Sequence, residues 1–177
     1  ELWTSLAVIS SDLVATAPIP AELDRLGWQR DLSITDSQTM VDYYRVSREG
    51  RVVFGKGGWT IAFGGRIRAA FDRSAARAAE VTADLHRYYP SLRSIPITHD
   101  WSGPIDRSPM GFPLFGHLGG REHIVYGVGW SGNGVGPSVL GGKILASLAL
   151  GRRDAWGMSP LINRPQGHFP PEPMRFL

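Results

Sequence analysis

At 177 residues the chain is long enough for a domain with a sizeable hydrophobic core. Its composition is globular, and a net charge of +3 without runs of like charge gives no signal for nucleic-acid binding. The lack of cysteine excludes disulfides, thiolate nucleophiles and zinc–sulfur sites, and it is compatible with the cytoplasm, where we expect the protein. No segment reaches about eighteen consecutive apolar residues, so we expect no membrane span.

The chain begins without an initiator Met or a charged signal region, close to a strand-like run from Leu6 to Thr16. We therefore expect that the N-terminal part of a longer protein is missing. Pro18-Ile19-Pro20 ends the run, because proline cannot continue a ladder. Two strand-forming segments, Met40 to Ser47 and Arg51 to Gly55, flank a tight Glu-Gly turn and predict a hairpin.

A helix is predicted after Phe71, with Asp72 or Ser74 as its N-cap and Pro90 closing it. Small alanines on its apolar face indicate close packing on a sheet. The apolar residues recur at spacings of three and four: Ala78, Val81, Leu85 and Tyr88.

The next segments alternate between strand and turn patterns. Ser94 to Ser102 predicts a strand that enters a turn at Gly103-Pro104, and a loop from Arg107 to Pro113 leads to a short strand, Leu114 to Leu118. Hairpins, one packed helix, more strands and a late helix predict an α+β fold with a mostly antiparallel sheet.

The most distinctive stretch reads as strand, glycine loop and helix. His123 to Tyr126 is the strand, Gly127 to Gly136 the loop, and Ser138 to Leu150 an almost wholly apolar helix that we expect to be buried. Pro137 suits a first helical position and Gly151 a left-handed C-terminal cap. Because the loop lacks bulky side chains and the helix start offers unpaired N–H groups, the stretch predicts a site for a flat or anionic ligand.

Gly127 to Gly132 is also a literal GxGxxG, with Asp154 about twenty residues on, as in a dinucleotide-binding fold. We reject that interpretation, because the chain after Gly151 has no strand-like run to carry the acidic residue. Trp130 within the loop would also crowd a pyrophosphate.

Other common chemistries lack their patterns. Ser102 and Ser131 adjoin glycines, but neither lies in a GxSxG nucleophile elbow, and no glycine pair continues into the Gly-Lys-Ser/Thr of a phosphate loop. We expect no metal site, because the histidines are dispersed without an i, i+4 pair. They are His86, His99, His117, His123 and His168.

Several aromatic residues allow both a packing role and a ligand contact. Tyr43 and Tyr44 are adjacent on a predicted strand and so point to opposite faces. Arg45 suits either an ion pair with Asp42 or a clamp for an acidic substrate. For these residues alone, packing is the simpler interpretation. We expect Trp130 to be exposed over the glycine loop.

Taken in order, several segments resemble the C-terminal half of FAD-dependent amine and amino-acid oxidoreductases of the D-amino-acid oxidase, glycine oxidase and sarcosine oxidase superfamily. The tail is similar to the ending of the γ-glutamylputrescine oxidase-like branch. The resemblance covers nearly the whole chain, and the order and spacing of the motifs are more specific than any one of them. The segments are Ala15–Pro20 (ATAPIP), Tyr43–Arg45 (YYR), Arg51–Gly55 (RVVFG), Trp101–Asp106 (WSGPID), Phe112–Gly116 (FPLFG), Gly127–Ser138 (GVGWSGNGVGPS), Gly142–Ala146 (GKILA) and the tail Phe169–Arg175 (FPPEPMR).

The resemblance implies an FAD enzyme that oxidises an amine C–N bond by hydride transfer to the flavin, with side chains that only orient the substrate. FAD is expected in the full-length protein, held with an N-terminal FAD-binding half, and not in this fragment, which alone would be inactive. The residues implied to bind the cofactor are Gly129, Trp130, Ser131, Gly132, Asn133, Gly134 and Val135, and those implied to bind substrate are Tyr43, Tyr44, Arg45 and Trp130.

Two positions depart from the family pattern. Many relatives have His where this chain has Asn133, which hydrogen-bonds but does not titrate. Glycine-oxidase-like members carry a carboxylate-binding Arg at the position of Gly132, so an amine such as a polyamine derivative is favoured over an α-amino acid. Without cysteine, a covalent flavin link cannot form within this segment.

We predict three parts within a larger two-domain flavoprotein. Residues 1–100 form a substrate-binding domain, 101–151 a segment that completes the FAD-binding domain, and 152–177 a Pro-rich tail. The competing hypothesis is a non-catalytic ligand-binding or interaction domain that keeps the fold without the cofactor half.

Overall fold

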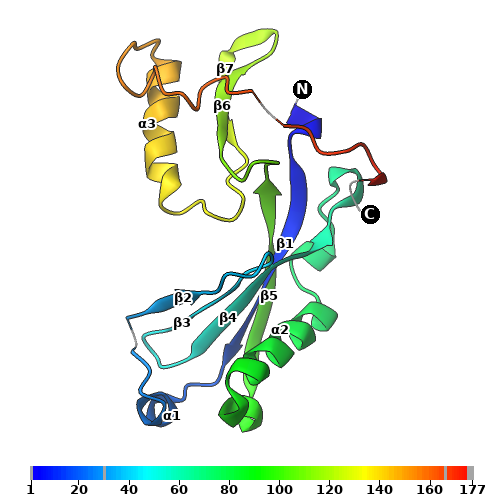
Figure 1. Cartoon of the computed structure of the whole chain (residues 1–177), viewed down its shortest axis with the longest axis vertical. Coiled ribbons are helices and arrows are strands. Elements are labelled where there is room, and N and C mark those ends of the chain that lie inside the picture. Colours follow the sequence, from blue (N-terminus) through cyan, green and yellow to red (C-terminus); the bar gives the residue numbers. More distant parts are fainter. Residues whose placement is uncertain (1, 30, 166, 175–177) are drawn as a thin grey trace. The chain divides into compact units, whose positions relative to one another are not determined.

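The computed structural model describes residues 2–29, 31–165 and 167–174, and the chain divides into two compact units (Figure 1). One unit comprises Ser10–Thr60 and Ile67–Pro104. The other comprises the residues up to Ile9, Ile61–Arg66 and the residues from Ile105 onward. The division places the predicted flavin-contacting loop in the second unit and Tyr43 to Arg45 in the first.

A five-stranded sheet has the order β2-β3-β4-β1-β5, and β3 pairs antiparallel with both β2 and β4. The β3–β4 register pairs Val46 with Val52, which closes the predicted hairpin, and Gly50 in its turn has a φ of 78° that favours glycine. The short strand β2 was not expected from the sequence. The strands are β1 (Ala7–Thr16), β2 (Ser33–Thr35), β3 (Asp42–Val46), β4 (Val52–Ile61) and β5 (Ile97–Arg107).

One face of this sheet is covered by the predicted helix, α2 (Ala75–Tyr88). The Ser74 hydroxyl accepts a hydrogen bond from the N–H of Arg77, so Ser74 is the N-cap. Val81 and Leu85 are fully buried against the sheet. Shorter helices are α1 (Pro20–Arg25), η3 (Ala69–Phe71) and η4 (Pro90–Ser94).

The predicted turn at Gly103-Pro104 is wrong, because β5 runs through both residues to Arg107. Proline lacks an N–H and is excluded from central strands, but β5 lies at the edge of the sheet, where no second neighbour needs that donor.

In the other unit, β6 (Leu114–Leu118) and β7 (Arg121–Val128) form an antiparallel hairpin, and α3 (Pro137–Ala149) packs on both strands (Figure 1). Phe115 and Ile144 are buried in this packing. Gly151 follows the helix with a φ of 61°, as predicted for a left-handed cap. This unit also contains η1 (Leu2–Thr4) and η2 (Phe63–Gly65).

The expectation that the apolar helix is buried all round is wrong for α3. Only Gly141, Ile144 and Ser147 are buried, whereas Val139 is 65% and Leu140 51% exposed. The hairpin of β6 and β7 is narrow and covers one side of the helix, which leaves an apolar outer face. The α+β class with mostly antiparallel strands is confirmed, and the three-part domain division stays a prediction.

Candidate functional site

The loop between β7 and α3 begins with a strained bend. Gly129, Ser131 and Gly132 have φ values of 80°, 55° and 86°. Glycine adopts such values without steric cost, but a side-chain-bearing residue such as Ser131 does so only where its surroundings enforce it. Strain of this kind is typical of functional sites.

The surroundings that enforce the bend come from Asp106 at the end of β5. Its carboxylate accepts hydrogen bonds from the N–H of Gly129 at 2.6 Å and of Trp130 at 3.1 Å. Its backbone carbonyl accepts a third, at 3.1 Å, from the N–H of Ser131. Three successive amides are therefore held by one residue.

Ser108 holds the same bend from a second position. Its N–H donates to the Ser131 hydroxyl oxygen at 3.1 Å, and that hydroxyl donates to the Gly129 carbonyl at 3.2 Å. A Cβ on Gly129 would lie only 3.0 Å from the Cβ of Ser108, so the close approach requires glycine. The sequence motifs predicted no role in the site for either Asp106 or Ser108.

The expectation that Trp130 is exposed over the loop is wrong. Its indole packs edge-on against Phe115, with ring centroids 5.7 Å apart, and reaches beneath α3. The tip of the ring, Cη2, lies 2.4 Å from where a Cβ on Gly141 would be. Trp130 thus anchors the loop to the hairpin and the helix, the packing role that the sequence left open.

Beyond the bend, several backbone N–H groups of the loop have no acceptor among the residues that the structure describes. The N–H of Asn133 donates to the Trp130 carbonyl at 2.9 Å. Within the described ranges, no acceptor is found for the N–H groups of Gly132, Gly134, Val135 and Gly136. They precede α3, whose N-terminal end carries partial positive charge. Val135 is 94% exposed and nothing lies within 4 Å of a Cβ on Gly136, so this part of the loop is open.

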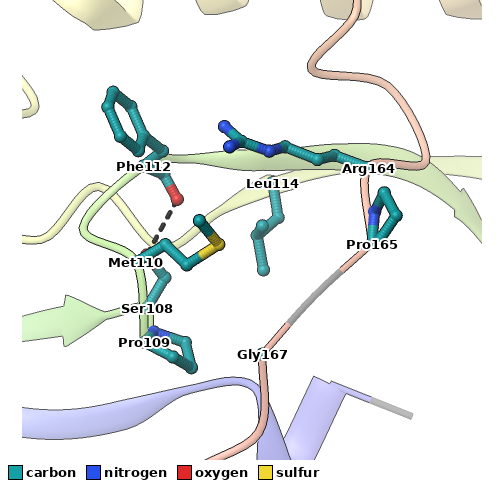
Figure 2. Close-up of a pocket in the computed structure, with 8 residues that line it drawn as sticks. All are labelled: Ser108, Pro109, Met110, Phe112, Leu114, Arg164, Pro165 and Gly167. Atoms are coloured by element: carbon teal, nitrogen blue, oxygen red, sulfur yellow. Dashed lines mark hydrogen bonds between the residues drawn. The ribbon is translucent and has the colours of Figure 1, made fainter.

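A small hollow adjoins Ser108 (Figure 2). The Ser108 hydroxyl donates to the Phe112 carbonyl at 2.8 Å, and the guanidinium of Arg164 lies over the Phe112 ring. With a volume of about 10 Å³ the hollow has room for about one water molecule and is too small for an organic substrate.

A larger apolar cavity of about 220 Å³ lies in the same unit. It is formed by the start of the chain, β1 and the end of β4. Its lining residues are Leu2, Trp3, Leu6, Ala7, Val8, Ile61, Ala62 and Gly65. None of the sequence-predicted site residues is among them.

Three of the four predicted substrate residues, Tyr43, Tyr44 and Arg45, lie on β3 in the other unit, whereas Trp130 lies in the loop before α3. Along β3 the side chain of Tyr44 leaves on the opposite face of the sheet from those of Tyr43 and Arg45. The Tyr43 ring packs so close to Gly55 that a Cβ there would be 2.4 Å from it, and its hydroxyl hydrogen-bonds that of Ser11. Burial raises the pKa of Tyr43. Tyr44 lies in the core beneath α2, stacked on Phe54, which is the packing alternative.

Arg45 does not pair with Asp42, because the two side chains leave the strand on opposite faces. The buried Asp42 carboxylate instead accepts from Lys56 Nζ at 2.8 Å. Arg45 is exposed, and no carboxylate partner is found for it in the described part of the chain. It therefore remains available to an acidic group.

The structure supports the rejection of a complete dinucleotide-binding motif. The Asp154 carboxylate caps its own turn, accepting from the N–H groups of Gly157 at 2.9 Å and Trp156 at 3.0 Å and from the Ser147 hydroxyl. These bonds, that from Gly157 first, lower the pKa of Asp154. The described residues contain no cluster able to hold a metal and no helix able to cross a membrane.

Residues 4–148 match the DAO family of FAD-dependent oxidoreductases, and the chain belongs to that family. FAD is the cofactor of this family.

Curated relatives include a probable oxidoreductase OrdL of Haemophilus influenzae, 28% identical over 81% of this chain and 30% of that protein. A gamma-glutamylputrescine oxidoreductase of Escherichia coli is 27% identical over 90% of this chain and 34% of its own length. The chain thus spans about a third of the length of these relatives.

Solved structures share the fold. Glycine oxidase from Geobacillus kaustophilus superposes with a TM-score of 0.68 at 21% identity, over 93% of this chain and 41% of that one. A fructosyl peptide oxidase superposes with a TM-score of 0.72 at 13% identity, over 94% of this chain and 43% of that one.

The residues present fit part of an FAD site. The open loop lacks side chains at Gly132, Gly134 and Gly136, and unpartnered N–H groups suit the carbonyl oxygens of a flat polar ring.

Proposed function

We propose that this chain is the substrate-binding part of an FAD-dependent oxidoreductase that oxidises an amine. The observation that carries the proposal is the open glycine loop before α3. Four of its backbone N–H groups, all between residues 132 and 136, have no acceptor among the described residues. Family membership supplies the cofactor. When bound, FAD would supply the acceptor for a hydride from the C–H next to the nitrogen of a neutral amine, so that the substrate becomes an iminium and, after loss of its N–H proton, an imine.

On the cofactor side, the residues proposed to contact the flavin are those of the loop. The N–H groups of Gly132, Gly134 and Val135 would donate to the pyrimidine edge of the ring, and Asn133 would add a neutral polar side chain. The open backbone lets the ring approach closely. Trp130 supports this surface from below through its packing on Phe115.

On the substrate side, Tyr43 and Arg45 are the proposed contacts. Both lie on the sheet face opposite α2, and Arg45 offers a guanidinium to an acidic group. Tyr44 would act only through packing. Gly132 stands where glycine-oxidase-like relatives carry a carboxylate-binding Arg, so we propose a polyamine-derived amine rather than an α-amino acid.

The exposed apolar face of α3 is the proposed contact for the N-terminal FAD-binding half. Val139 and Leu140 lie on α3 and Leu150 directly follows it, and each of the three is at least half exposed. A patch of this kind is typical of an interface. We propose the cytoplasm as the compartment, in keeping with a chain without cysteine.

The test uses a longer protein that contains this chain and is about as long as the relatives that it matches. Purified protein should show the visible absorption of oxidised flavin, and anaerobic addition of γ-glutamylputrescine or another N-substituted polyamine should bleach it. A folded protein without bound flavin would support the competing ligand-binding domain instead.

Variants of two arginines test the substrate side. Arg45→Ala should raise the dissociation constant of amine substrates that carry an acidic group, so that more substrate is needed to reduce the flavin. Arg48→Ala, in the exposed turn between β3 and β4, removes the same charge and serves as the control. Equal effects of the two substitutions would contradict a role for Arg45 in binding.

A further inference from the structure

Asp106 is half-buried at the end of β5, and three successive N–H groups of the loop converge on it. The Gly129 amide is buried, so its N–H requires an acceptor within the protein. A carboxylate offers two acceptor oxygens and forms stronger bonds than a neutral group. One side chain can therefore hold two amides at 2.6 Å and 3.1 Å.

The strain in the loop lies within this segment. Ser131 has a φ of 55°, a conformation that side-chain-bearing residues rarely adopt, and its own N–H is bound by the Asp106 carbonyl. A strained residue persists only where neighbouring bonds fix it. The bonds to Asp106 also commit the donors of residues 129–131, so only later amides remain for a ligand.

We infer that Asp106 is a positioning residue that sets the conformation of the bend at 129–132 and, through it, the affinity for flavin. The inference rests on the proposed function. Asp106 touches no substrate or cofactor in this role. It acts by fixing where the unpartnered amides of Gly132, Gly134 and Val135 point.

The chain contains a matched control at the other end of α3. The Asp154 carboxylate also accepts two backbone N–H bonds, from Trp156 at 3.0 Å and Gly157 at 2.9 Å, within the same unit. It fixes a turn after the helix rather than the loop before it. Loss of either carboxylate removes two hydrogen bonds to backbone amides, but only the Asp106 carboxylate binds amides of the proposed flavin loop.

The experiment compares Asp106→Ala, Asp106→Asn and Asp154→Ala in the longer protein that contains this chain, the same one used to test the proposed function. Asp106→Ala should raise the FAD dissociation constant at least about tenfold, equal to about 1.4 kcal/mol, and shift the visible spectrum of bound flavin. Asp106→Asn keeps one acceptor oxygen and should recover part of the affinity. Asp154→Ala should lower the melting temperature without changing FAD affinity or spectrum.

Hydrogen exchange of the apoprotein provides a measurement that does not depend on flavin. The amides of Gly129 and Trp130, which the carboxylate binds, should exchange at least about tenfold faster in both Asp106 variants. Their exchange should be unchanged in Asp154→Ala. If the unmodified protein binds no FAD, the proposed function fails, and exchange alone decides whether Asp106 sets the bend. If it binds FAD, unchanged exchange or unchanged affinity in Asp106→Asn and Asp106→Ala overturns the inference and leaves the proposed function intact. Equal loss of affinity in Asp154→Ala overturns it too, because that result indicates general destabilisation.

Discussion

Two adjacent glycines in α3 should respond in opposite ways to the same substitution. A Cβ on Gly141 would lie 2.4 Å from Trp130 Cη2 and 3.1 Å from Phe115 Cζ, whereas nothing lies within 4 Å of a Cβ on Gly142. Both residues are in the helix interior. Gly141→Ala and Gly142→Ala therefore share the change in helix propensity and differ only in packing.

The magnitude follows from these two contributions. Alanine in place of glycine in a helix interior stabilises by about 1 kcal/mol, which Gly142→Ala should gain in full. At Gly141 the new methyl group would overlap the Trp130 ring by about 1 Å relative to ordinary contact. Overpacking of this kind costs about 1–3 kcal/mol. We expect Gly141→Ala to be less stable than Gly142→Ala by about that amount.

Urea unfolding followed by circular dichroism gives the free energies of unfolding. Trp130→Phe supplies the second arm, because phenylalanine lacks the ring atom that meets the methyl group. In that background Gly141→Ala should lose most of its penalty and approach the effect of Gly142→Ala, because only the milder contact with Phe115 at 3.1 Å remains; the difference is a coupling between positions 130 and 141. Equal stabilities of the two alanine variants, or a penalty of undiminished size with Phe at position 130, would refute the packing of Trp130 beneath α3.

Three further outcomes are expected. Lys56→Met should lower the free energy of unfolding by up to about 3–5 kcal/mol, because the fully buried Asp42 carboxylate loses its ion pair at 2.8 Å and keeps only the more distant Arg87, at 3.8 Å. Arg25→Ala at the exposed pair with Glu22, measured by the same urea titration, should change the free energy of unfolding far less. Burial alone would raise the pKa of Asp36, but hydrogen bonds from Gln38, from Tyr88 and from two backbone amides lower this pKa to about 2. The folded-state pKa lies below the unfolded one, so this contribution to stability is present above about pH 4 and is lost as the pH falls towards 2; carboxyl NMR titration should show a higher pKa for Asp36 in Tyr88→Phe. The 177-residue chain expressed alone should purify colourless, and FAD that survives gel filtration with it would contradict the proposal that the rest of the cofactor contacts lie elsewhere.

Short-range patterns predicted much of the fold. The β3–β4 hairpin, Ser74 as the cap of α2 and the glycine that ends α3 each depend on residues close in sequence, and each is confirmed. The turn at Gly103-Pro104 failed because the rule for proline depends on whether a strand lies at an edge. Sheet order is a long-range property, and the local sequence does not contain it.

The loop before α3 shows the same division between what is local and what is not. Its glycines and the N-terminus of the helix could be predicted from consecutive residues, and the expectation of a flat or anionic ligand, which stays a prediction, rests on them. The sequence could not predict which amides lack an acceptor among the described residues, because that depends on Asp106, more than twenty residues earlier, which binds the donors of Gly129 and Trp130. The Trp130 ring then takes the space left by Gly141. A loop rich in glycine would be mobile by itself, and the carboxylate of Asp106 and the indole of Trp130 are what fix its backbone in one conformation, which the proposed binding of a rigid, planar ligand requires.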